Sequence, residues 1–126
     1  MFLARKMRNI SRALLQVYGT KRVKRLLWNS EFAHGRWNAL DSTPDDWIYP
    51  FIEKHARGGS ILDLGCGSGN TGNELNPGAY SHYTGVDISD VAIDKARTRT
   101  QAHGRAETCR YLQSDIVDYV PAHSST

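Results

Sequence analysis

A glycine-rich run behind a short apolar segment, Ile61-Leu62-Asp63-Leu64-Gly65-Cys66-Gly67-Ser68-Gly69-Asn70, constrains the fold of this chain more than any other feature. Residues 60–64 are mostly apolar, as a buried parallel strand is. Glycines at 65, 67 and 69 allow a sharp turn into a helix and leave room for a ligand at the backbone. Ligands of open parallel sheets bind at the carboxyl ends of the strands. The run therefore predicts a strand, a turn and a helix, with a binding site at the turn.

Strand and helix patterns alternate through the rest of the chain. We expect strands over residues 60–64, 83–87 and 108–114, and helices over about 70–75 and 89–103. Ser89 is placed to cap the longer helix and Gly104 to end it. Strands that alternate with helices imply right-handed parallel crossovers. The fold class that follows is α/β, with a doubly wound parallel sheet of which three strands are present.

The N-terminal residues predict helices of another kind. Apolar residues at steps of four and three form one stripe, which predicts a helix over residues 1–18; its members are Leu3, Met7, Ile10, Leu14 and Val17. We expect a short basic helix over about 21–28 and an irregular, aromatic-rich stretch over 29–43. The predicted division is a helical arm with the segment that follows it, residues 1–43, and an α/β domain, residues 44–126.

A further helix is expected before the first strand. Ser42 or Thr43 would cap it, and Pro44 would occupy its first position. Pro50 should interrupt or restart this helix, because proline lacks the N–H that an interior turn needs. The pair Gly58-Gly59 should end it.

Positive charge is concentrated at the N-terminus. Residues 1–30 hold eight of the sixteen Lys and Arg and no acid, whereas the other 96 residues hold eight against thirteen Asp and Glu. Three interpretations of this arm stay open. The apolar stripe packs on the body or on a partner; the arm contacts an anionic surface, either membrane or nucleic acid; or the arm is a mitochondrial presequence.

Three acids are placed to meet a ligand at the predicted turn. Asp63 precedes the first glycine by two residues, Asp87 ends the second strand and Asp115 follows the third. A dinucleotide fingerprint needs a third glycine where Asn70 stands, and a carboxylate at Asp63 suits a cationic ligand better than a pyrophosphate. An acid about 20 residues after the turn is typical of a contact to ribose hydroxyls. A plain turn with unrelated carboxylates is the alternative, and for Asp115 a turn cap is a strong rival.

These segments resemble class I S-adenosylmethionine-dependent methyltransferases, which have a Rossmann-like fold. The glycine run resembles their first motif, residues 83–89 their second and residues 112–116 their third. Upstream, Trp28-Asn29-Ser30-Glu31-Phe32 and Gly35-Arg36-Trp37 resemble the segment that precedes the first motif in the small-molecule branch. The resemblance covers nearly all of residues 28–121.

The resemblance implies roles for individual residues with S-adenosylmethionine as cofactor. Backbone at Gly65, Cys66, Gly67 and Gly69 would contact the methionine part, and Asp63 would orient its amino group, directly or through water. Asp87 would bind both ribose hydroxyls. Ile88 would pack on the adenine, whose edge Asp115 and Ile116 would hold. The implied function is methyl transfer to a small-molecule acceptor.

In the family resembled, a fourth strand follows the third motif and lies beside the first. This chain reaches residue 121 and continues as a short polar tail. We therefore expect the first strand to form an open, apolar edge without protective charges. That edge predicts a homodimer or a partner chain, and a product truncated after the third motif. The alternative function is a non-catalytic, cofactor-binding module that needs a partner chain.

The remaining residue types limit the chemistry. Two cysteines, Cys66 and Cys109, lack zinc-ligand spacing and predict reduced thiols in a cytoplasmic protein. The five histidines are scattered, so no catalytic residue and no metal site is predicted. A nucleotide- or NAD-binding domain is a third hypothesis, which Asp63 and Asn70 disfavour.

Overall fold

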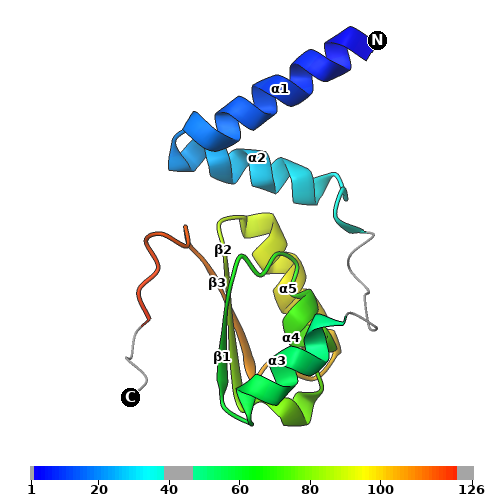
Figure 1. Ribbon diagram of the computed structural model, residues 1–126, viewed down its shortest axis with the longest axis vertical. Coiled ribbons are helices and arrows are strands. Elements are labelled where there is room, and N and C mark those ends of the chain that lie inside the picture. Colours follow the sequence, from blue (N-terminus) through cyan, green and yellow to red (C-terminus); the bar gives the residue numbers. More distant parts are fainter. Residues whose placement is uncertain (1, 39–46, 122–126) are drawn as a thin grey trace.

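The computed structural model describes residues 2–38 and 47–121. Its elements are α1 (Phe2–Tyr18), α2 (Lys21–Ala33), α3 (Ile48–Ala56), β1 (Ser60–Leu64), α4 (Asn70–Glu74), a 3-10 turn (Pro77–Ala79), β2 (His82–Asp87), α5 (Asp90–Ala102) and β3 (Cys109–Gln113). Figure 1 shows the sheet with α3, α4 and α5 on one side and α2 across its upper end. The helix α1 extends away from the rest of the molecule.

The three strands form one parallel sheet in the order β1-β2-β3. Leu64 pairs with Val86 and Val86 with Leu112, so the carboxyl ends of all three strands lie at the same edge. This arrangement confirms the expected α/β fold with a partial Rossmann-like sheet. It places the glycine turn after β1 beside the end of β2.

One face of the sheet forms the core. Tyr83, Cys109 and Tyr111 point from this face toward the helices and are almost fully buried with Ile93 and Ala96. The rings of Tyr83 and Tyr111 pack with centroids 5.9 Å apart. This dense packing holds the glycine turn and α5 in fixed positions above the strands.

The opposite face of the sheet is exposed at β1. Leu62 and Leu64 are 45% and 50% exposed, and no helix among the described residues covers them. Among the strands of the described residues, β1 pairs only with β2. The predicted open edge is therefore present in this structure.

Several predicted boundaries need correction. α2 runs to Ala33, well beyond residue 28, so part of the stretch expected to be irregular is helical. Pro50 does not interrupt a helix, because α3 begins at Ile48 and Pro50 falls in its first turn, where the missing N–H has no helical partner to lose. Arg57 itself adopts the left-handed conformation at the end of α3, at φ 50°, one residue before Gly58. The predicted cap at Ser42 or Thr43 lies outside the described residues, as does the tail from residue 122.

The two N-terminal helices form the predicted arm. Thr20 separates them and caps α2 by accepting a hydrogen bond from the Val23 N–H. No residue of α1 is buried. None of the described helices is both long enough and apolar enough to span a bilayer.

Candidate functional site

The turn between β1 and α4 is shaped by its glycines. Gly65, Gly67 and Gly69 have φ angles of 86°, 56° and 83°, a region that residues with a β-carbon rarely enter. The N–H groups of Gly65 and Cys66 both donate to the Val86 carbonyl, at 2.7 and 3.0 Å. The turn is therefore bonded to the end of β2, and its backbone faces the carboxyl end of the sheet.

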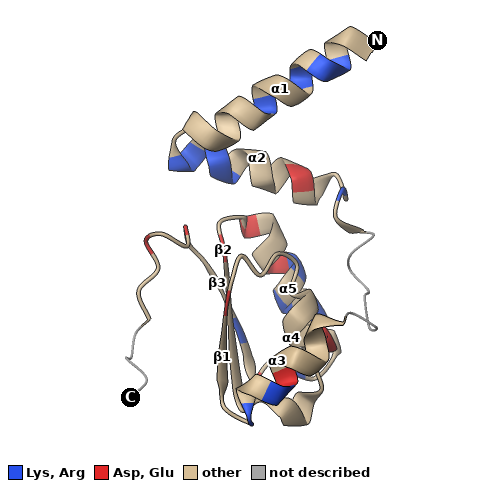
Figure 2. Ribbon diagram, viewed as in Figure 1, with Lys and Arg blue, Asp and Glu red and all other residues tan. Residues whose placement is uncertain are grey.

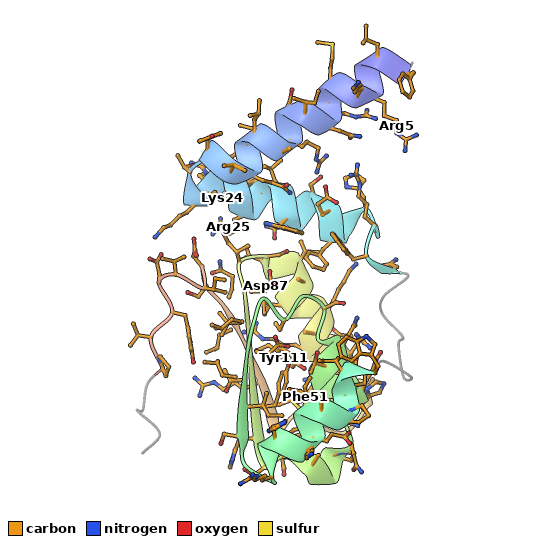
Figure 3. The ribbon with its side chains drawn as sticks, viewed as in Figure 1. Arg5, Lys24, Arg25, Phe51, Asp87 and Tyr111 are labelled. Atoms are coloured by element: carbon orange, nitrogen blue, oxygen red, sulfur yellow. The ribbon has the colours of Figure 1, made fainter. Side chains whose placement is uncertain are left out.

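Asp87 is held at the centre of this arrangement. Its Oδ2 accepts the Gly67 N–H at 3.0 Å and its Oδ1 accepts the Ser89 N–H at 2.9 Å. The residue is 9% exposed. Figure 3 shows Asp87 at the upper end of the sheet, below α2. Because each oxygen is fixed by a backbone donor, the carboxylate has one orientation, and each oxygen keeps a lone pair for a ligand hydroxyl.

A cavity of about 520 Å³ opens at this point. Its lining comes from the turn, from the residues after β2 and β3, and from the arm: Lys24, Trp28, Phe32, Trp37, Gly65, Cys66, Gly67, Ser68, Asn70, Asp87, Ile88, Asp115, Ile116 and Val117. The volume is that of an ordinary small-molecule site. Seven of the nine predicted cofactor residues line it, all except Asp63 and Gly69. Carboxylates, glycine backbone and apolar side chains suit a nucleoside with a cationic, amino-acid-like arm.

Asp63 is not part of the cavity lining, and it accepts a hydrogen bond from the Tyr83 hydroxyl. Burial raises the pKa of Asp63, and nearby Asp87 adds to the rise, whereas the Tyr83 hydrogen bond opposes it. A cation nearby would favour the ionised carboxylate. The predicted contact of Asp63 with an amino group stays a prediction.

Gly69 has a packing role in addition to any contact with a ligand. A β-carbon at this position would lie 2.8 Å from the Ala96 β-carbon. The residue precedes α4 and allows that helix to approach α5. Its amide donates to the Cys66 carbonyl at 3.1 Å, which closes the turn.

Asp115 lines the cavity and also caps a turn. Its Oδ1 accepts the Val117 N–H at 2.9 Å, and its carbonyl accepts the Asp118 and Tyr119 N–H groups. The rival interpretation of this residue as a turn cap is therefore present in the structure. A role toward adenine remains compatible with this geometry, because Ile116 and Val117 lie beside it in the lining.

The arm forms the roof of the cavity. Asn29 accepts the Ser89 hydroxyl at 2.7 Å, and Lys95 donates to the Phe32 carbonyl at 2.6 Å, so α2 is bound to α5. Trp28 and Trp37 pack with ring centroids 6.1 Å apart. Lys24 and Phe32 complete this wall, and none of its four residues was among the predicted site residues. The aromatic spacing over residues 28–37 was the signal for the wall.

Neither a thiolate nor a histidine is available among the described residues of the cavity. Burial raises the pKa of the Cys66 thiol, and Asp63 and Asp87 add to the rise, so the thiol is protonated at neutral pH. None of the described histidines lines the cavity. Over residues 2–38 and 47–121, no cluster of His, Cys, Asp or Glu could hold a metal ion. The arrangement suits binding and positioning of a ligand.

These features define an α/β protein with a cavity at the carboxyl ends of its strands that suits a nucleoside-like ligand. Residues 55–126 match the family model of the methyltransferase domain, and the chain belongs to that family. S-adenosylmethionine is the cofactor of these methyltransferases.

Individual relatives extend the comparison. The chain is 34% identical over 65 residues to trans-aconitate 2-methyltransferase of Enterobacter sp., covering 51% of this chain and 23% of that protein. It is 29% identical over 69 residues to O-methyltransferase rstn1 of Aspergillus nomiae, covering 55% of this chain and 31% of that protein. The chain thus spans less than a third of these curated relatives.

Solved structures show the same fold. A TehB-like SAM-dependent methyltransferase from Corynebacterium glutamicum superposes with a TM-score of 0.56 at 26% identity, covering 75% of this chain and 50% of that one. A methyltransferase from Thiobacillus denitrificans, solved with S-adenosyl-L-homocysteine, has a TM-score of 0.52 at 24% identity, covering 68% and 37%. The second of these likenesses concerns the fold alone.

Proposed function

We propose that this chain is the cofactor-binding part of an S-adenosylmethionine-dependent methyltransferase that acts on a small molecule. The observation that carries the proposal is Asp87, fixed by the Gly67 and Ser89 amides at the wall of a cavity. A carboxylate held in this way needs no rearrangement to receive two neighbouring hydroxyls. Membership of the methyltransferase domain family also supports S-adenosylmethionine as the ligand.

The lining residues divide into three parts in this proposal. Backbone of Gly65, Cys66 and Gly67 faces the methionine end, and Asp87 binds the ribose hydroxyls. Ile88 and Ile116 enclose the adenine, with Asp115 at its edge. Asp63 acts on the amino group through water, because it does not line the cavity. The cofactor supplies the methyl group; the chain orients it and excludes water, which is the main requirement of such a transfer.

The cofactor site is tested by calorimetry of the purified chain with S-adenosylhomocysteine. Asp87→Asn should weaken binding by about 1–3 kcal/mol, the worth of a hydrogen bond to a charged group. Asp94→Asn is the matched control, because its side chain is 77% exposed on α5 and lies outside the cavity. An unchanged affinity in Asp87→Asn, with the fold intact, would contradict the ribose role.

The small-molecule acceptor is proposed from the arm. Trp28, Phe32 and Trp37 give the cavity an aromatic wall, and Lys24 adds a cation that suits an acidic or polarised acceptor. A methyl-transfer assay with labelled cofactor and small carboxylic acids tests this. Transfer to none of them, with cofactor binding intact, would favour the second candidate function, a non-catalytic module that needs a partner chain. The edge of β1 with its exposed Leu62 and Leu64 is the observation that favours that candidate.

Two further expectations belong to the proposal. The open edge of β1 would pair with a strand of a partner chain or a second copy, because its apolar residues Leu62 and Leu64 are exposed. Light scattering of the purified chain tests for a second copy.

The site of action would be the cytoplasm, in keeping with two buried, free thiols, Cys66 and Cys109. Cell fractionation tests this location.

A further inference from the structure

The helix α1 contacts the rest of the molecule through its polar face. Arg12 and Gln16 are the members of α1 that are partly buried. The Arg12 guanidinium lies 3.0 Å from the Glu31 carboxylate of α2, and Glu31 is 8% exposed. A soluble amphipathic helix normally packs through its apolar stripe. In this structure the packing is reversed.

The apolar stripe of α1 faces away from α2. Its members, Leu3, Met7, Ile10, Leu14 and Val17, are each more than half exposed. At about 100° per residue these five positions share one side of the helix, and Arg12 lies on the opposite side. The expectation that the stripe packs on the body is therefore wrong for the described residues. Figure 1 shows that α1 projects clear of the sheet and its helices.

The charges of α1 determine what chemistry can cover this stripe. Arg5, Lys6 and Arg8 are exposed, and α1 contains no acid. Figure 2 shows the cations spread along α1 and gathered at the start of α2. A second copy packed stripe to stripe would place Lys6, which flanks the stripe, beside a helix that offers no acid to pair with it. A nucleic acid would satisfy the charges but leave the aliphatic stripe in water. A surface that is both apolar and anionic satisfies both features.

We propose that α1 binds an anionic membrane surface, with its axis in the plane of the membrane and its Leu3–Val17 stripe in the lipid interface. Basic amphipathic helices bind bilayers in this way, by buried apolar area together with attraction to anionic headgroups. Lys6 borders the stripe and lies beside the headgroups, whereas Arg5 and Arg8 lie near the Arg12 side of the helix and add longer-range attraction to the anionic surface. Arg12 stays paired with Glu31, so the helix docks without releasing its contact with α2.

Co-sedimentation of the full chain with vesicles tests this proposal. Binding is expected to vesicles of phosphatidylcholine and phosphatidylglycerol, weaker at high salt, and absent with phosphatidylcholine alone. Ile10→Gln/Leu14→Gln should lower the partition coefficient about 100-fold, because two aliphatic side chains no longer enter the interface. Arg5→Gln/Lys6→Gln/Arg8→Gln should lower it at least about 10-fold on the anionic vesicles.

The matched control is Phe51→Gln/Val120→Gln, which removes two exposed apolar side chains outside the arm. This control should bind the vesicles as the unmodified chain does, and circular dichroism should show that all variants keep their helices. No binding to anionic vesicles would overturn the proposal. Binding that survives Ile10→Gln/Leu14→Gln would also overturn it, because charge alone would then suffice, as with a nucleic acid. Concentration-dependent dimers lost in that variant, without lipid binding, would assign the stripe to a second copy.

Discussion

The arm and the sheet body bury their apolar residues to very different extents. In the body, Tyr83, Ile93 and Tyr111 face inward and are at most 3% exposed. In α1, the apolar stripe lies in solvent, and the polar face makes the internal contact. Apolar side chains are thus buried in one region and exposed in the other.

This difference shows that amphipathicity alone does not fix which side of a helix packs inward. In the body, the crossovers between parallel strands leave α5 one face of the sheet to cover. In the arm, an ion pair between Arg12 and Glu31 selects the polar face. Glu31 also lies 3.2 Å from Arg36, so one buried carboxylate joins both ends of the arm.

The largest expected effect tests the body. Ile93 is 1% exposed and packs in the core between α5 and the sheet. Ile93→Ala should lower the free energy of unfolding by about 2–5 kcal/mol, because it leaves a cavity in a closely packed region. Urea denaturation followed by circular dichroism measures the change. A loss below about 1 kcal/mol would mean that the core is looser than its exposures indicate.

The next effect tests the contact that orients the arm. Glu31→Gln removes the carboxylate that Arg12 and Arg36 share and leaves the Arg12 guanidinium, 23% exposed, without its charged partner. We expect the docking of α1 on α2 to weaken by about 1–2 kcal/mol. Hydrogen exchange should accelerate in α1 and early α2, and amides of β2 should exchange as before.

Asp94→Asn serves as the control for that substitution. This substitution removes the exposed ion pair with Arg97, at 3.9 Å. It should leave hydrogen exchange in the arm unchanged within measurement error. Equal exchange of α1 in Glu31→Gln and Asp94→Asn would show that another contact orients the arm.

A smaller effect concerns Asp63 and pH. Burial and Asp87 raise the pKa of Asp63 above its ordinary 3.8, so the folded chain binds this proton more tightly than the unfolded chain does. The ionised carboxylate therefore costs stability as pH rises through the raised pKa, and costs nothing below the unfolded value. Asp63→Asn keeps an acceptor for the Tyr83 hydroxyl and removes that cost.

The variant should match the unmodified chain in acid and exceed it at neutral pH by about 1 kcal/mol or less. Thermal unfolding across that pH range measures the difference. A gain that is equal at every pH would contradict the assigned cause. Calorimetry of the same variant with S-adenosylhomocysteine separately tests the proposed contact with the amino group.

Much of the body could be predicted from the sequence because its signals are local. The apolar run before Gly65 predicted β1 with its bounds, and Ser89 capped α5 as expected, accepting the Ala92 N–H at 3.1 Å. The cavity lining followed from the same logic, since parallel strands bring their carboxyl ends together. The position of Asp87 at the end of a predicted strand was enough to predict that it lies at the cavity.

The remaining features depend on contacts between distant residues. The hydrogen bonds of Asn29 with Ser89 and of Lys95 with Phe32 fix α2 over the cavity, but these partners lie 60 and 63 residues apart and carry no local signal. The Asp63–Tyr83 hydrogen bond depends on the register of β1 and β2, which composition does not encode. The full length of α2 was missed because its aromatic end shows no strong helical period in the sequence, while hydrogen bonds from Ser89 and Lys95 hold this end in the structure.

The smallest expected effect is also the sharpest test of the comparison. Ile10 has the same side chain as Ile93 but is 52% exposed on α1. Ile10→Ala should change the free energy of unfolding by no more than about 0.5 kcal/mol, since no packed neighbour loses a contact. Denaturation at two protein concentrations measures this. A loss near that of Ile93→Ala would mean that the stripe is already covered in solution; a loss that grows with protein concentration would identify a second copy as the cover.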